Sequence, residues 1–190
     1  MTDIVRPGAG IVFMKVGKHA QESLEDIIKR KRREIEEAGY ALWGYGGGTC
    51  HPLSTVQPFA RAFERKGHVI YLCMQPMDSS HSADPERAAE SSADGLHWQA
   101  IPPAINVLGS RYALAIRDLR REEFDLPLEQ TRVASGLSRG RAGSSYIGGR
   151  VDKACLEIAE TEVEQPNEHA HVQIGLVAKL VEPYAVLLRK

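Results

Sequence analysis

Residues 43–52 combine residue types that suit the binding of a flat anion. Glycine allows backbone conformations that other residues avoid and lets a ligand approach the main chain, so amide N–H groups in such a turn can meet an anion. Neighbouring aromatic rings can pack against a planar group. The candidate ligand-binding residues here are Trp43, Tyr45, Gly46, Gly47, Gly48 and Thr49. A tight turn whose aromatic rings belong to the core would show the same pattern.

Cys50 and His51 follow these glycines and raise a catalytic alternative. A thiol becomes a good nucleophile when a base or a positive environment lowers its pKa. Neighbours in one turn seldom point at each other, so His51 is a poor base for Cys50, and the sequence singles out no other histidine. The leading interpretation therefore assigns no catalytic residue. A cysteine-dependent enzyme that acts on a nucleotide or phosphorylated substrate is the alternative.

A second segment, residues 131–150, is rich in arginine, glycine and serine. Guanidinium groups match phosphate oxygens, small residues let the backbone lie close to a ligand, and tyrosine can stack on a base. Asp152 is the only acid in the slightly longer range 131–153. The candidate ligand-binding residues here are Arg132, Arg139, Arg141, Tyr146 and Arg150. The alternative is a surface loop solvated by its arginines.

Cofactor and metal signatures are missing from the sequence. The lysine and glycine spacing of 43–52 differs from that of nucleotide-binding loops, and the spacing of Asp78, His81 and Asp84 is not specific to a metal. The 3 cysteines lack the close spacing of a zinc site or a disulfide framework. We expect no cofactor and no metal, and we expect Cys73 to be a core residue.

The first half of the chain predicts alternating strands and helices. The apolar run 10–16 predicts a strand, and residues 20–38 have helical periodicity that stops at Gly39. Residues 40–45 predict a strand, 54–66 a helix with Ser54 as its N-cap, and 68–74 a buried strand. The basic run 29–33 lies on the first helix, where we expect a solvated face with ion pairs to nearby glutamates.

The second half predicts more strands than helices. We expect a long excursion over 75–95 with a short helix at 85–91, then strands at 104–107 and 111–117. Residues 120–129 are expected to be irregular. A mixed segment at 151–158 precedes a hairpin of 169–180 and 184–188 that turns at Glu182-Pro183. The chain is therefore expected to be one α/β mixed (α+β) domain over 1–190: a small β-barrel or mixed sheet with two or three flanking helices.

The order of elements in residues 10–75 carries a family resemblance. A strand with Phe13-Met14-Lys15 precedes a helix, then come a turn with Trp43, a short helix and the segment 67–71. This order resembles the front half of EVE domains in the PUA-like superfamily. The resemblance implies a small β-barrel that recognises a nucleic acid, often through a modified base in an aromatic pocket. Trp43 and Tyr45 would then lie near that pocket, and the arginine-rich segment would contact phosphates.

The overall composition does not indicate what the protein binds. The 190 residues have a formal net charge of −1, so a polyanion site must come from local clustering. The N-terminus has no signal-peptide pattern, and no apolar stretch approaches membrane-spanning length, so we expect a cytoplasmic protein with no membrane contact. The expected function is non-enzymatic binding of nucleic acid or a nucleotide. A protein-interaction module of a defence or counter-defence system is a further alternative, and the oligomeric state stays open.

Overall fold

The computed structural model describes residues 3–46, 51–79, 83–147, 151–160 and 171–190. Within these residues, nine strands form one mixed sheet, with a main path of β2-β6-β9-β3-β1-β8-β7. The strands are β1 (Gly10–Val16), β2 (Ala41–Gly44), β3 (Tyr71–Pro76), β4 (Glu90–Ser92), β5 (Gln99–Ala100), β6 (Tyr112–Pro127), β7 (Thr131–Val133), β8 (Lys153–Ile158) and β9 (His171–Arg189). The helices are α1 (Leu24–Ala38), α2 (Pro52–Arg65), the four-residue α3 (Gly143–Tyr146) and the 3₁₀ turn η1 (Leu128–Gln130). The expected α+β class, with a mixed sheet and flanking helices, is confirmed.

Strand β1 lies inside the sheet and is buried on both faces, as its unbroken apolar run predicts. It pairs in parallel with β3 and antiparallel with β8. Ile11 and Phe13 face one core, and Val12 and Met14 face another. Cys73 on β3 is also fully buried, as expected. β1 therefore separates the two cores. The segment that follows Val16 leaves the sheet and lines the cleft described below.

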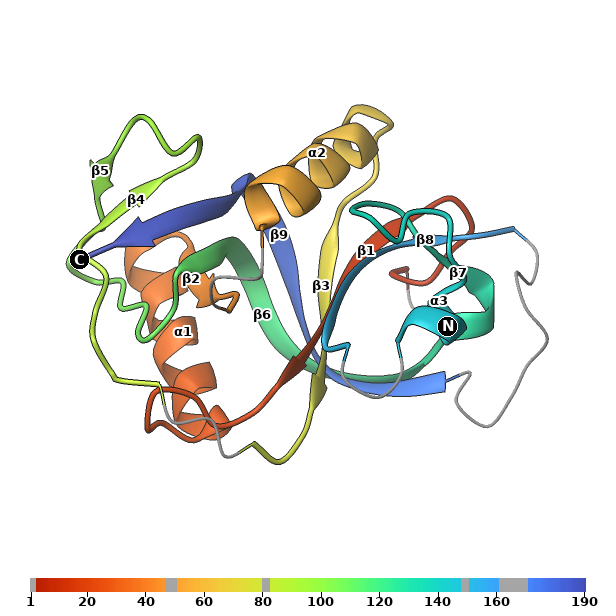
Figure 1. Cartoon of the computed structure of the whole chain (residues 1–190). Coiled ribbons are helices and arrows are strands. Elements are labelled where there is room, and N and C mark those ends of the chain that lie inside the picture. Colours follow the sequence, from red (N-terminus) through yellow and green to blue (C-terminus); the bar gives the residue numbers. More distant parts are fainter. Residues whose placement is uncertain (1–2, 47–50, 80–82, 148–150, 161–170) are drawn as a thin grey trace.

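Helix α1 begins at a serine N-cap and ends at a glycine. The side chain of its N-cap, Ser23, accepts a hydrogen bond from the backbone N–H of Asp26 at 3.1 Å. Gly39 ends the helix with a φ of 86°, a left-handed conformation that glycine adopts without strain. Ile27 and Ile28 pack into the core that also contains Trp43. Figure 1 shows α1 beside β2 and the first half of β6, away from β7 and β8.

Helix α2 begins three residues earlier than the sequence indicated. Its N-cap is His51, followed by Pro52 at the first helical position, where proline is well tolerated. Ser54, the expected cap, instead donates its hydroxyl proton back to the His51 carbonyl oxygen at 2.9 Å. Phe59 and Phe63 form the buried face of the helix.

The second half of the chain departs further from expectation. The expected helix at 85–91 is absent from the described residues, where β4 pairs with β9 and β5, and residues 104–107 form no strand. Residues 120–129, expected to be irregular, mostly belong to the long strand β6. The expected hairpin is one strand, β9, which runs through Pro183. Figure 1 shows β6 and β9 curving together across the whole molecule.

Candidate functional site

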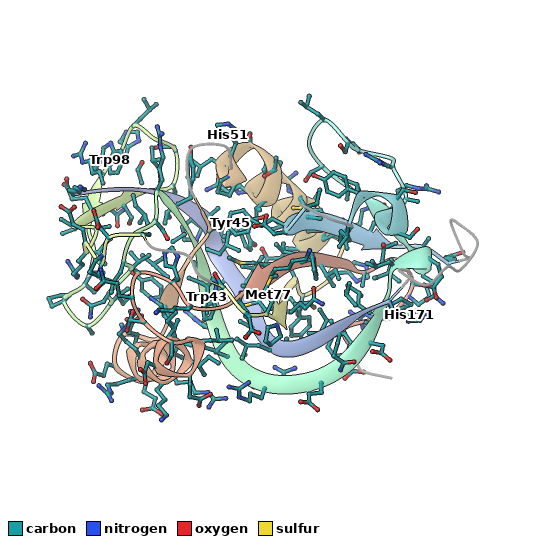
Figure 2. All side chains as sticks on the ribbon, turned by 60° about the horizontal axis from the view of Figure 1, so that its bottom comes forward. Trp43, Tyr45, His51, Met77, Trp98 and His171 are labelled. Atoms are coloured by element: carbon teal, nitrogen blue, oxygen red, sulfur yellow. The ribbon has the colours of Figure 1, made fainter. Side chains whose placement is uncertain are left out.

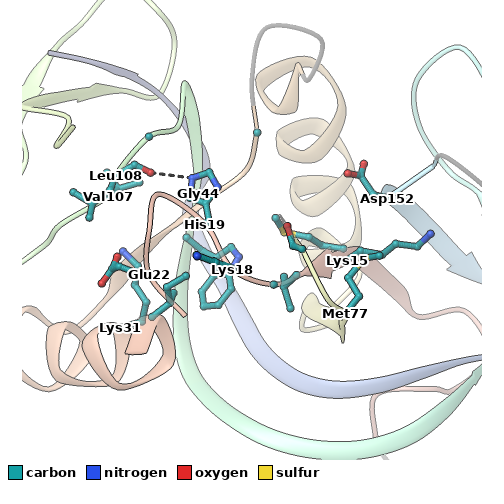
Figure 3. A pocket seen from close by; sticks show the side chains of 18 of the residues that line it. Lys15, Lys18, His19, Glu22, Lys31, Gly44, Met77, Val107, Leu108 and Asp152 are labelled. Atoms are coloured by element: carbon teal, nitrogen blue, oxygen red, sulfur yellow. Dashed lines mark hydrogen bonds between the residues drawn. The ribbon is translucent and has the colours of Figure 1, made fainter. Parts of the chain in front are cut away.

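A cleft with a volume of about 400 Å³ lies where β1 leaves the sheet for α1. Its walls come from six parts of the chain: residues 14–19, residues 22–31 before and in the first half of α1, residues 43–46 at the end of β2, Met77 with Ser79, residues 107–109, and Asp152 with Lys153 at the start of β8. Figure 3 shows Lys31 and Glu22 at the α1 side of the cleft, with Lys15 and Asp152 at the other side. The cleft is therefore assembled by tertiary structure from segments distant in sequence.

Apolar side chains form one wall of the cleft. Trp43 on β2 is 4% exposed and lines the cleft together with Val16, Val107 and Met77. Met77 is 48% exposed although it is a large apolar residue. Trp43 and Met77 also lie near each other in Figure 2. Trp43 is also part of the core, so this wall offers only a small exposed part of its ring, beside the exposed and flexible thioether of Met77, to a partly apolar ligand.

Positive charge dominates the remaining lining. Among the described residues, the charged lining comprises five cations, Lys15, Lys18, Arg30, Lys31 and Lys153, against two acids, Glu22 and Asp152, and His19 lies among them. Within the described residues, the ammonium groups of Lys15 and Lys18 have no ion-pair or hydrogen-bond partner. Lys18 is exposed and Lys15 half-buried. These two amines are available to a negatively charged ligand.

The basic run on α1 is only partly the solvated face that the sequence indicated. Lys31 and Glu34 are both buried, and the Lys31 ammonium donates to Glu34 Oε2 at 3.1 Å and to the Asn106 carbonyl oxygen at 2.6 Å. Arg30 forms ion pairs with Glu22 at 2.6 Å and with Glu34 at 2.9 Å. Burial lowers the pKa of Lys31 to about 8, although the nearby Glu34 charge raises it. This network holds α1 against residue 106 and makes a rigid, charged wall.

His19 joins two sides of the cleft. Its Nε2 lies 3.1 Å from the carbonyl oxygen of Leu108 and 3.2 Å from Ser110 Oγ, and Figure 3 shows the first of these contacts. Gly44 lies beside this contact, and a Cβ atom there would be 2.4 Å from Ser110 Oγ. A side chain at position 44 would therefore disturb the contact between Ser110 and His19.

The residues predicted in the glycine-rich segment divide into three groups. Trp43 and Gly46 line the cleft. Tyr45 is 4% exposed and packs in the core, with Lys153 Nζ 5.6 Å from its ring centroid. Gly47, Gly48, Thr49 and Cys50 lie outside the described residues.

His51 and the two described cysteines bear on the catalytic alternative. His51 is exposed at the start of α2, with its ring centroid 6.3 Å from that of Tyr112. Burial raises the pKa of Cys73 well above its usual range and that of Cys155 to about 12, so neither thiol is poised to act as a nucleophile at neutral pH.

The predicted arginines form a second surface outside the lining of the cleft. Arg132 is exposed on β7, and Arg139 and Arg141 are exposed in the turn between β7 and α3. Arg141 Nη2 donates to the Ser145 carbonyl oxygen at 3.0 Å, and its guanidinium lies 6.0 Å from the ring centroid of Tyr146. Arg150 lies outside the described residues.

Strand β8 links the arginine surface to the cleft: its Leu156–Ile158 end pairs with β7, and Lys153 at its other end lines the cleft. A Cβ atom at Gly136, in the turn between β7 and α3, would lie 3.7 Å from Thr55 in the first turn of α2.

Sequence reasoning did not predict that the cations of the cleft come together. Lys15 and Lys18 were not singled out as ligand-binding residues, and Lys153 was noted only as a cation at the end of the arginine-rich segment, because no short motif joins the three. One signal was present: Gly17 and Lys18 directly follow a buried strand that ends with Lys15 and Val16, and a helix comes next. Such a segment must leave the sheet at its edge, where its side chains meet a cleft.

No protein-family model, curated protein or solved structure matches this chain. The resemblance to EVE domains therefore stays an expectation. Among the described residues, no helix combines the length and apolar character that crossing a bilayer requires.

Proposed function

We propose that the protein binds a nucleotide, or one nucleotide unit of a nucleic acid, in the cleft beside Trp43. The observation that carries this proposal is the pairing of an apolar aromatic wall with the ammonium groups of Lys15 and Lys18, which lack partners in the described part of the chain. A base has a flat π face that stacks on an aromatic ring, and its phosphate is an anion that charged donors bind strongly. The cleft offers both kinds of contact in about 400 Å³.

The exposed arginines extend this proposal from a nucleotide to a nucleic acid. Arg139 and Arg141 lie outside the cleft lining, so we assign them to phosphates other than the one bound in the cleft. They would contact backbone phosphates of flanking nucleotides, which position a nucleic acid without reading its sequence. The cleft would supply preference for a particular base, including a modified one, as the resemblance to EVE domains implies.

A binding assay with matched lysine variants tests the proposal. Fluorescence anisotropy of a labelled ten-nucleotide single strand would be measured for the native protein, for Lys15→Ala with Lys18→Ala, and for Lys29→Ala. Lys29 is exposed on α1 but does not line the cleft, so Lys29→Ala shows how much the loss of one positive charge away from the cleft weakens binding. We expect the double variant to bind about tenfold or more weakly, since hydrogen bonds to charged groups contribute about 1.5–3 kcal/mol.

Competition by free nucleoside monophosphates separates cleft binding from binding along the backbone. A monophosphate that displaces the strand from the native protein supports the cleft. If Lys15→Ala with Lys18→Ala weakens binding no more than Lys29→Ala does, the proposal is contradicted. Absence of any nucleotide or nucleic-acid affinity would favour the enzyme or protein-interaction alternatives.

A further inference from the structure

Leu137 is the most exposed large apolar residue in the described part of the chain. Its exposed fraction is 108% of the reference value, so it makes almost no contact with the rest of the protein. It lies in the turn between β7 and α3, between Gly136 and Arg139. A single exposed leucine is common on protein surfaces, and its meaning depends on how it is held and what surrounds it.

The turn that carries Leu137 is held by backbone hydrogen bonds. The backbone N–H of Val133 donates to the Arg141 carbonyl oxygen, and that of Gly140 donates to the Val133 carbonyl oxygen, each at 2.8 Å. Gly136 and Gly140 have φ values of 80° and 92°, which let the chain reverse on either side of Leu137. The side chain is therefore presented by an ordered tip. Binding through such a tip loses less conformational entropy than binding through a disordered loop.

The charged residues of the tip itself are all positive. Arg139 and Arg141 follow Leu137 closely, and residues 131–147 contain no acid. Within the described residues the Arg139 guanidinium has no partner, while Arg141 is oriented by Ser145 and Tyr146. An apolar tip with two exposed guanidinium groups beside it is complementary to a surface of closely spaced phosphates with an apolar interior.

We propose that Leu137 is a wedge that enters between adjacent base pairs of double-stranded DNA while Arg139 and Arg141 contact the phosphates beside it. The proposal rests on the nucleic-acid binding proposed above and names the form of nucleic acid. Leucine side chains inserted from the minor groove partly unstack a base step and kink the duplex. Arginine is favoured in the same groove because the negative potential there is strong.

Other polyanionic surfaces fit the tip less well. Stable attachment to an anionic membrane needs a broad apolar face or a second anchor, and a single leucine provides neither. A double-stranded RNA has a deep, narrow major groove and a shallow minor groove that proteins contact mainly by shape. Duplex DNA offers both the flexible base step and the flanking phosphates.

The experiment uses a 20-base-pair DNA duplex with 2-aminopurine beside a flexible TA step, a base whose fluorescence rises when it is unstacked. Three variants of the full chain are compared with the native protein. Leu137→Ser removes the wedge, Leu137→Met keeps an apolar side chain of similar size, and Leu96→Ser removes a different leucine that is 80% exposed. The exposed position of residue 137 leaves folding intact in both of its variants, which thermal melting checks.

We expect Leu137→Ser to bind the duplex about tenfold more weakly and to lose the rise in 2-aminopurine fluorescence. Leu137→Met and Leu96→Ser should behave as the native protein. All four proteins should bind the single strand equally, since the wedge acts on stacked base pairs.

Several results would overturn the proposal. If the native protein binds the single strand but not the duplex, the wedge is wrong and the cleft proposal stands. If no nucleic acid binds, both are wrong. Equal duplex affinity and fluorescence for native protein and Leu137→Ser would reject the wedge alone. A loss of binding to phosphatidylserine vesicles by Leu137→Ser, with duplex binding unchanged, would assign the tip to membranes.

Discussion

Lys31 and Glu34 form an ion pair of 3.1 Å at the wall of the cleft, and each side chain is about 2–3% exposed. Both residues also bond to the main chain of Asn106: Lys31 to its carbonyl oxygen and Glu34 to its N–H. A buried ion pair contributes little net stability, because the desolvation of two charges opposes their attraction. Its structural effect here is to fix α1 and residue 106 in one arrangement.

The stability of the protein should rise in mildly alkaline solution because of Lys31. Its pKa is about 8 in the folded protein and near the ordinary value of 10.5 in the unfolded chain, so the unfolded chain holds more protons between these pH values. The free energy of unfolding then increases as pH rises from about 8 to about 10.5, by at most about 3 kcal/mol. Urea unfolding of the native protein and of Lys31→Met at pH 7.5, 9 and 10 measures this increase.

Lys31→Met keeps an unbranched side chain and removes the titrating group, so its unfolding free energy should lack this increase. Other titrating groups contribute equally to both proteins and cancel in the difference. The same pH dependence in both proteins would show that Lys31 does not titrate in this range.

Gly44→Ala should lower the free energy of unfolding by about 1–3 kcal/mol. The new methyl group would lie 2.4 Å from Ser110 Oγ, which must move and give up its contact with His19. Adding Ser110→Ala removes the colliding atom, so the double variant should be more stable than the sum of the two single changes predicts. A double-mutant cycle by urea unfolding measures this coupling. If the two substitutions change the free energy of unfolding in a strictly additive way, a collision with Ser110 is not the cause of the destabilisation.

Sequence patterns predicted the elements whose signals are local. The apolar run of β1 and the periodicity of α1 before Gly39 are such signals, and both elements form close to the expected bounds. The long strands β6 and β9 were predicted only as shorter pieces, a strand at 111–117 and a hairpin of 169–180 and 184–188, because bulges interrupt their alternation. Residues 181–184 of β9 stand opposite Ala115 alone, so Pro183 resembled a hairpin turn. Strand pairing determines such features, and it is not readable from one short window.

The candidate site was predictable only in part, for the same reason. Trp43 stood out because it adjoins a glycine-rich turn. Lys153 and Met77 are ordinary in sequence, and they acquire a role only because β8 and the end of β3 flank β1. Likewise, the basic run on α1 contains Lys31, whose burial depends on residues 75 positions away. In a site assembled from distant segments, most lining residues carry no local signature.

Replacing Arg139 and Arg141 with alanine should weaken nucleic-acid binding regardless of base sequence. Removing one arginine from its phosphate makes the plot of log affinity against log salt shallower by about 0.7 for single strands, so the two changes together should make it shallower by about 1.4. Arg33→Ala with Arg65→Ala is the matched control, since both arginines are exposed on helices away from the turn. Salt titrations by fluorescence anisotropy give the slopes. An unchanged slope in the Arg139 and Arg141 variant would remove these residues from the interface.

The central claim, that Trp43 contacts the bound nucleotide, can be measured through its own fluorescence. Trp98→Phe leaves Trp43 as the only tryptophan, and Trp98 packs against Arg189 outside the cleft. Titration of this variant with the ten-nucleotide strand should quench the emission of Trp43 to saturation, with the midpoint that anisotropy gives. Lys15→Ala with Lys18→Ala should shift that midpoint to higher concentration. Binding by anisotropy without any change in Trp43 emission would show that the nucleic acid lies elsewhere on the protein, and would contradict the cleft as its site.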